Sequence, residues 1–291
     1  MTRSRHQADA DPDDRTTRPC RSSVKFFVLT FALAIPFVVY GAWTRLLLLP
    51  GLPVAALMFV CPGMAALILT YRDRGTAGAK ELLSRALDYK RISPKVWYAP
   101  IFLIAPSVAA LSYGVIRLTG ARVPAPQIAL LPTILLGVTF LVGALGEELG
   151  WSGYATDPLQ NRWGAVKAGL LLGSIWAAFH YAALLEANRS ISWIAWWSVG
   201  TVATRVIMVW LYNNAGKSVV GAALFHMTGN LAWQLFPIRG SYFDPRINGL
   251  ITAIVAAVVI VRMRPRAATA STLVPLRSDR VFDPRQPSDG D

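Results

Sequence analysis

The sequence is poor in charge: Asp, Glu, Lys and Arg together make up 15% of its 291 residues, while hydrophobic residues make up 54%. Soluble globular domains carry about 25% charged residues, so an ordinary soluble domain is excluded. Cysteine is scarce as well, and Cys20 and Cys61 offer neither a metal-binding spacing nor a disulfide framework. The sequence has no internal repeat and no glycine-rich phosphate loop. Ten Trp and a mean hydropathy of +0.43 instead predict a polytopic helical membrane protein.

Apolar stretches of about 20 residues are long enough to cross a bilayer. Residues 1–22 and 264–291 are polar and are predicted to be disordered cytoplasmic tails, which leaves residues 23–263 as one intramembrane domain. We therefore predict an all-α fold of about eight transmembrane helices. Their predicted ranges are 24–44, 52–71, 96–116, 127–147, 166–186, 191–212, 218–236 and 247–262.

The distribution of basic residues predicts how these helices are oriented. With both termini cytoplasmic, 22 Lys and Arg fall on the cytoplasmic side and six on the other, and Arg205 lies within a span. This asymmetry is typical of multi-pass proteins of the cell membrane with cytoplasmic termini. It also accounts for the net charge of +13, so we expect no nucleic-acid partner. Within the long connection 72–95, residues 80–87 are predicted to form either an amphipathic helix on the membrane surface or a solvated connector.

Few side chains in the apolar stretches are able to do chemistry. Glu147 and Glu148 lie at the end of one such stretch, where a bare carboxylate costs several kcal/mol and usually has a function. His180 lies in the next apolar stretch, and His226 and Asn230 share one helix face two stretches later. Helix rise places the glutamates closer to the membrane surface than the histidines. We therefore predict a cytoplasm-facing polar cavity that brings these groups together.

A carboxylate and an imidazole together polarise a water molecule, and a second imidazole and an amide stabilise an oxyanion. The set thus fits hydrolysis of an amide bond. Other interpretations remain open: glutamates that face the cytosol, histidines that only pack between helices, or a proton-coupled transporter, although no inverted repeat supports transport.

Three short motifs resemble those of the CPBP family, the CAAX proteases and bacteriocin-processing enzymes that are also called the Abi family of intramembrane proteases. They are 147–154 (EELGWSGY), 176–180 (WAAFH) and 225–230 (FHMTGN). The segments 157–165 (DPLQNRWGA) and 210–219 (WLYNNAGKSV) are similar to this family too. The close resemblance covers residues 127–236, and the earlier stretches resemble the family only in hydropathy.

The resemblance implies an eight-helix intramembrane endopeptidase that works without a metal. Glu147 and His180 would activate water, and His226 and Asn230 would form the oxyanion hole. Glu148 would support these groups. The substrate would be a peptide or protein that enters from the cytoplasmic side, and its identity does not follow from the chain.

One position departs from the family pattern, which has Arg four residues after the second glutamate. Ser152 stands there, and Arg205 in the sixth apolar stretch is a possible substitute from another helix or an arginine that pairs elsewhere. A catalytically weakened or inactive member that acts as a membrane binding or immunity protein is therefore the alternative prediction.

A metalloprotease is a further alternative, since two His and one Glu complete many catalytic zinc sites. The ligands would be Glu147, His180 and His226, each from a separate span, because the sequence has no His-x-x-x-His pair. We prefer the metal-free mechanism.

Overall fold

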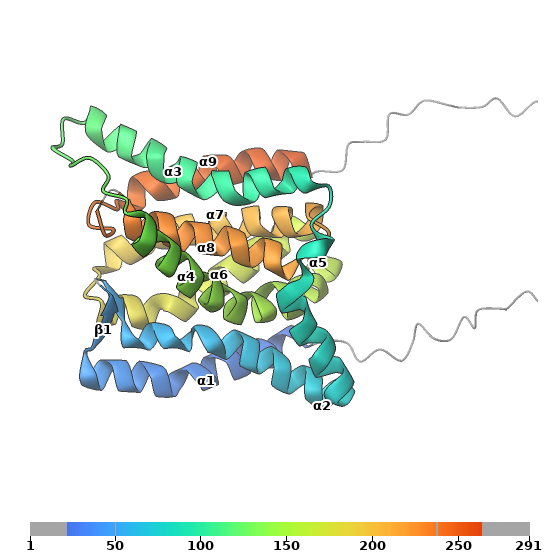
Figure 1. Ribbon diagram of the computed structural model, residues 1–291. Coiled ribbons are helices and arrows are strands. Elements are labelled where there is room, and N and C mark those ends of the chain that lie inside the picture. The colour runs from blue at the N-terminus through green and yellow to red at the C-terminus, as the bar shows by residue number, and fades with distance from the viewer. Residues whose placement is uncertain (1–21, 50, 237, 264–291) are drawn as a thin grey trace, which may run out of the picture.

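The computed structural model describes residues 22–49, 51–236 and 238–263, which form long helices lying side by side (Figure 1). Helix α1 begins and helix α9 ends at the same end of the bundle, which we call the terminal end. The all-α class is confirmed. The helices are α1 Ser23–Thr44, α2 Val60–Ser84, α3 Tyr98–Leu118, α4 Leu130–Gly150, α5 Asp157–Trp163, α6 Ala165–Glu186, α7 Ile191–Asn214, α8 Val219–Leu235 and α9 Pro245–Met263.

Short elements complete the described chain. A small hairpin of β1 (Leu47–Leu49) and β2 (Leu52–Pro53) connects α1 to a 3-10 turn that leads into α2. This turn spans Val54–Phe59, and two more 3-10 segments, Arg85–Arg91 and Lys95–Trp97, lie between α2 and α3. The hairpin lies between the end of α1 and the start of α2, at the end of the bundle opposite the terminal end (Figure 1).

Seven helical stretches of the described chain are long and apolar enough to cross a membrane. Helix α8 has 17 residues and lies inside the bundle, where it packs against α3, α4 and α7. Its neighbours cover most of its apolar surface, whereas α1, α3 and α4 expose many large hydrophobic side chains. Exposed apolar surface of this extent suits lipid, so the chain is a multi-pass membrane protein.

Most of the connection 72–95 is helical, as the first of its two predictions has it. Helix α2 continues through it to Ser84, with a break at Gly75 (φ 62°), and the 3-10 segment Arg85–Arg91 follows directly. Leu82 is buried, and Arg85 donates hydrogen bonds to the carbonyl oxygens of Gly153 and Lys217. The segment 80–87 is therefore helical, with Leu82 and Arg85 in contact with the bundle and Leu83 and Leu87 exposed. Its place on a membrane surface stays a prediction.

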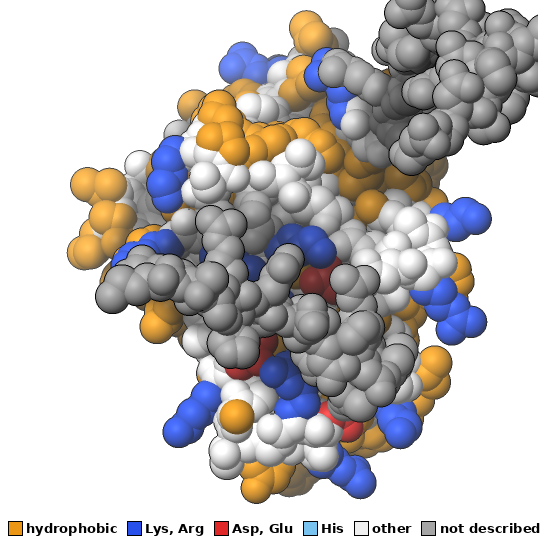
Figure 2. Space-filling view, turned by 90° about the vertical axis from the view of Figure 1, so that its right-hand side faces the viewer, with side chains coloured by type: hydrophobic (Ala, Val, Ile, Leu, Met, Phe, Trp, Pro, Cys, Tyr) orange, Lys and Arg blue, Asp and Glu red, His pale blue; other side chains and the backbone are white. Residues whose placement is uncertain are grey.

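Basic side chains lie around the rim of the terminal end, which faces the viewer in Figure 2. The connection 72–95 carries seven Lys and Arg. That the termini are cytoplasmic remains a prediction. The predicted tails 1–22 and 264–291 lie outside the described residues, apart from Ser22, which caps α1.

Candidate functional site

Glu147 and Glu148 lie in the last turn of α4, and the helical chain continues beyond them. Residues Trp151–Thr156 form a π-helical segment in which all six residues are buried, and α5 follows without interruption. From Glu148 to the end of α5 is about four helical turns, as is the distance from the start of α6 to His180. The glutamates are therefore not shallower than the histidines, because the fourth helix does not end at them.

Close helix contacts hold this segment in place. A Cβ at Gly150 would lie 2.4 Å from the carbonyl oxygen of Pro62 in α2. A Cβ at Gly63 would lie 2.5 Å from the carbonyl oxygen of Gly146 in α4. Only glycine permits such a close approach of two backbones. Gly63 and Gly150 therefore allow the turn of α4 that carries the glutamates to pack directly against α2.

The Glu147 carboxylate is bound by two indoles. Trp176 Nε1 donates to Oε2 at 2.8 Å, and Trp151 Nε1 donates to the same oxygen at 3.2 Å. In the described chain Oε1 accepts no hydrogen bond, and His226 Nε2 lies 4.0 Å away from it. Glu147 also lines the main cavity. One oxygen is thus fixed, and the other remains available to a bound molecule.

The Glu148 carboxylate is fully buried and its acceptor sites are occupied. Arg205 Nη1 donates to Oε2 at 2.8 Å, and Arg205 Nη2 donates to Oε1 at 3.0 Å. Ser152 Oγ donates to Oε2 at 2.5 Å, and His226 Nδ1 lies 3.1 Å from Oε1. Two oxygens accept about four hydrogen bonds at most, so Glu148 has no capacity left for a substrate.

Hydrogen bonds fix the orientation of both imidazoles. His180 Nδ1 lies 2.8 Å from the carbonyl oxygen of Trp176, an atom that only accepts, so Nδ1 carries the proton. His226 Nδ1 donates in the same way to Glu148. Both rings meet the indole of Trp176 edge-on, with ring centroids 5.6 Å and 5.1 Å away. Each ring is left with Nε2 as its free nitrogen.

The main cavity has a volume of about 610 Å³ and is lined by four of the five predicted site residues: Glu147, His180, His226 and Asn230. Asn230 is one helical turn after His226 on α8 and is half-buried. Glu148 lies behind this wall and does not line the cavity. The structure therefore brings the predicted residues together, and it separates one acid that faces the cavity from one that does not.

The cavity is mainly apolar, and it reaches the end of the bundle opposite the terminal end. Its lining there includes residues 51–53 before α2, Ser112 and Tyr113 of α3, and residues 242–245 before α9. Two predictions therefore conflict: if the termini are cytoplasmic, this mouth is not cytoplasm-facing. This conflict could not be seen from the sequence, because only the depth of the polar residues placed the predicted cavity.

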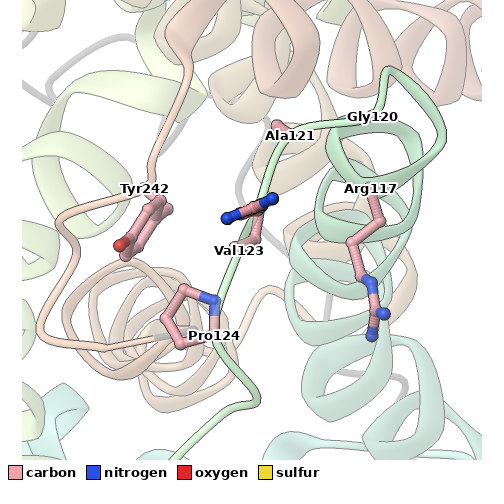
Figure 3. Close-up of a pocket in the computed structure, with 7 residues that line it drawn as sticks. Arg117, Gly120, Ala121, Val123, Pro124 and Tyr242 are labelled. Carbon is pink, nitrogen blue, oxygen red and sulfur yellow. The ribbon is translucent and has the colours of Figure 1, made fainter.

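A second hollow of about 560 Å³ lies at the connection between α3 and α4. Figure 3 shows Tyr242 on one side of it, Val123 and Pro124 across from that ring, and Arg117 on α3. Tyr242 also lines the main cavity, so the two spaces are neighbours. None of the predicted site residues lines this second hollow.

Sequence reasoning missed the two tryptophans that hold Glu147. Trp176 is the central one: its indole donates to Glu147, its carbonyl oxygen fixes His180, and Arg205 lies over its ring at 4.1 Å. Its position one turn before His180 was the available signal. Trp151, one turn after Glu147, gave a similar signal.

The zinc alternative has little geometric support. Within the described residues, no group of three or more His, Cys, Asp or Glu side chains is arranged so that it could hold a metal ion. Glu147, His180 and His226 share the cavity wall, and one oxygen of Glu147 is already taken by two indoles.

Comparisons with known proteins show what the chain is similar to. Residues 127–232 match the family model described as type II CAAX prenyl endopeptidase Rce1-like. The chain is also 27% identical over 240 residues to CAAX prenyl protease 2 of Methanococcus maripaludis, an alignment that covers 76% of this chain and 83% of that protein. The resemblance to the CPBP family is confirmed. Family and relative are both proteases, so the comparisons support an endopeptidase embedded in the membrane.

Proposed function

We propose that the protein is an intramembrane endopeptidase of the CAAX-protease type that hydrolyses a peptide bond with an activated water and no metal. The observation that carries the proposal is the wall shared by Glu147, His180, His226 and Asn230. All four groups reach one cavity from three helices, and the buried Glu148 fixes one of the two imidazoles from behind.

The water would lie between Oε1 of Glu147 and Nε2 of His180. Both atoms are free of other hydrogen bonds in the described chain, and both accept a proton. As the water oxygen bonds to the carbonyl carbon, its proton passes to the Glu147–His180 pair. The same proton then passes to the amide nitrogen when the C–N bond breaks, so the pair serves first as base and then as acid.

The oxyanion would be stabilised by Asn230 and His226. The amide of Asn230 donates directly. His226 Nδ1–H is bound to Glu148, so its Nε2 donates only when the ring carries both protons. A protonated His226 would balance the charge of this buried group, since two carboxylates would then face one guanidinium and one imidazolium.

The first experiment measures cleavage by the purified full-length protein in detergent. The substrate is a peptide that ends in a CAAX sequence, with and without a farnesyl group on its cysteine, because the relative is named a CAAX prenyl protease. We expect cleavage detected by mass spectrometry, and loss of cleavage in Glu147→Gln and His180→Gln. Glu81→Gln is the matched control, because Glu81 is an exposed carboxylate on α2. If both site variants cleave at the wild-type rate, the mechanism is wrong.

The metal-free mechanism is tested on the same preparation. After exhaustive chelation we expect unchanged turnover and no stoichiometric metal by elemental analysis. Turnover that disappears on chelation and returns with zinc would support the metal site of Glu147, His180 and His226 instead.

The inactive-binder alternative arose from Ser152. In the structure Glu148 is already bound by a guanidinium, that of Arg205, so the departure at 152 does not leave the two acids without a cation. This observation favours the endopeptidase over the binder.

Orientation and the side of substrate entry need a separate experiment. We propose a cell-membrane protein with cytoplasmic termini. A substrate delivered from the cytoplasm would then have to reach Glu147 and His180 by a route other than the mouth at the opposite end of the bundle. Arg122→Cys and Arg162→Cys, each in a Cys20→Ser background, place one exposed thiol at opposite ends of the bundle, while the remaining Cys61 is buried. In spheroplasts a membrane-impermeant maleimide should label residue 122 and spare residue 162. The reverse pattern would turn the bundle over and give the cavity a cytoplasmic mouth.

A further inference from the structure

We propose that Arg205 is a positioning residue of this site: from α7 it supplies the cation that holds Glu148, a function that no basic side chain on the glutamates' own helix performs. The inference rests on the proposed function and goes beyond it, because it assigns a role to a residue that lies outside all three motifs. Arg205 does not line the cavity, so it acts through its neighbours and not on the substrate.

The contacts of Arg205 are those of a built ion pair. Its side chain and that of Glu148 are both fully buried, and its two terminal nitrogens bind the two carboxylate oxygens separately. Such two-point binding fixes the rotation of the carboxylate as well as its position. A buried arginine that only filled space would leave five donors unpaired, at a high cost in free energy.

Close packing of α6 against α7 accompanies the position of the Arg205 guanidinium next to Glu148. A Cβ at Gly173 in α6 would lie 2.9 Å from Cα of Val202 and 3.0 Å from Cβ of Arg205. The missing side chain lets α7 approach α6 closely at this level. From this position Arg205 binds Glu148 on α4, a residue 57 positions earlier in the chain.

Through Glu148 and Trp176, Arg205 influences both groups that face the substrate. The Glu148 oxygen that it binds through Nη2 also accepts from His226 Nδ1, so the ion pair sets the orientation of that ring. The guanidinium also lies over the indole of Trp176, which donates to Glu147. Its loss would thus disturb the general base and the oxyanion donor together, without a direct contact to either.

Ser152 occupies a position from which a basic side chain could bind Glu148 in place of Arg205. It lies one turn after Glu148, and its hydroxyl donates to Oε2, the oxygen that Arg205 Nη1 also binds. A longer basic side chain at 152 would therefore reach the same carboxylate from its own helix. One carboxylate does not need two guanidinium groups, and like charges this close repel each other. We therefore expect one guanidinium, at position 152 or at position 205, to hold Glu148 in its active orientation. Guanidinium groups at both positions should impair the site.

The test compares four full-length variants with the wild type: Arg205→Met, Arg205→Lys, Ser152→Arg and Ser152→Arg/Arg205→Ala. Turnover of the CAAX peptide should fall about 100-fold in Arg205→Met, with KM nearly unchanged, because transition-state contacts are lost and substrate contacts are not. Arg205→Lys should fall less, since charge remains. Ser152→Arg alone should lose activity, and the double variant should recover most of it. Arg262→Met, an exposed arginine in the last turn of α9, is the matched control.

A second measurement does not depend on any substrate. The chain has three histidines, so a sample with ¹⁵N in its histidine rings gives three sets of signals, and His226→Gln assigns one of them. We expect the ring signals of His226 to change in Arg205→Met and to return in the double variant. A role in folding alone would not move these signals in protein that remains folded.

Each outcome has one meaning. The proposal is overturned if Arg205→Met keeps wild-type turnover and wild-type His226 signals, or if Ser152→Arg alone raises turnover. It is also overturned if the double variant turns over no faster than Arg205→Met. If the wild type cleaves no peptide and the His226 signals still follow the cation, the positioning role stands and the proposed function fails. Should Arg205→Met not fold, the lysine and double variants decide the question.

Discussion

Replacing Trp176 by Phe should impair catalysis more than any other conservative change of an aromatic residue near the site. The substitution keeps a ring of similar shape at this buried position and removes the indole N–H that donates to Glu147 at 2.8 Å. It also weakens the cation–π contact with Arg205, whose guanidinium lies 4.1 Å from the centroid of the Trp176 ring. The ring's edge contacts with the histidines are largely kept.

The size of the effect follows from these two contacts. A hydrogen bond to a charged group contributes about 1.5–3 kcal/mol. A desolvated cation–π contact contributes about 2 kcal/mol, of which Phe retains part. If about 2–4 kcal/mol is lost in the transition state, turnover falls about 30- to 1000-fold.

Trp151→Phe is the matched comparison. Trp151 donates to the same oxygen of Glu147 at the longer distance of 3.2 Å, and its indole packs against Phe26 and Phe179. We expect a loss of about tenfold, because a single weaker hydrogen bond is removed.

The assay measures kcat and KM for the CAAX peptide, together with thermal unfolding in detergent to separate catalysis from stability. If the two tryptophan variants lose activity equally, the special position of Trp176 is refuted. The same holds if Trp176→Phe stays within about threefold of the wild type, since the contacts then carry less than 1 kcal/mol.

Three further predictions concern stability in detergent micelles. Arg205→Met should lower the free energy of unfolding by about 3–5 kcal/mol, and Glu148→Gln/Arg205→Met should recover most of this loss. If the losses of stability from Glu148→Gln and Arg205→Met simply add in the double variant, a buried ion pair is contradicted. Asp88 accepts from the first backbone amides of α8, so Asp88→Ala should cost about 1–2 kcal/mol and speed hydrogen exchange in that helix; unchanged exchange would show that the cap is dispensable. Gly63→Ala should cost about 1–3 kcal/mol by forcing α2 from α4, while Gly114→Ala, with open space around it, should not destabilise; equal melting temperatures would disprove the close contact.

Most of the fold could be predicted because each helix carries its own signal. An apolar stretch of about 20 residues reports a span regardless of its neighbours. The ends were less predictable. Helix α2 extends to Ser84, well beyond the predicted end of the apolar stretch at residue 71. Lys, Arg and Glu have high helix propensities, so the helix continues after the apolar stretch has ended. The π-helical segment Trp151–Thr156 has no signal in hydropathy.

The site was predictable only in part. Glu147, His180, His226 and Asn230 stood out as polar residues in apolar stretches, and they share one cavity in the structure. Arg205 was only a candidate, because a pairing between α4 and α7 depends on how the helices pack and no local pattern encodes it. The mouth of the cavity was unpredictable for the same reason, since it is formed by connections far apart in the sequence.

The unequal surroundings of the two glutamates have a consequence for inhibitor chemistry. Both oxygens of Glu148 are enclosed by donors from three different helices, counting the segment that continues α4. Glu147 keeps one oxygen toward the cavity. A covalent reagent that esterifies carboxylic acids, carried on an apolar tail that fits the cavity, should therefore reach Glu147 and not Glu148, although the two stand next to each other in the chain.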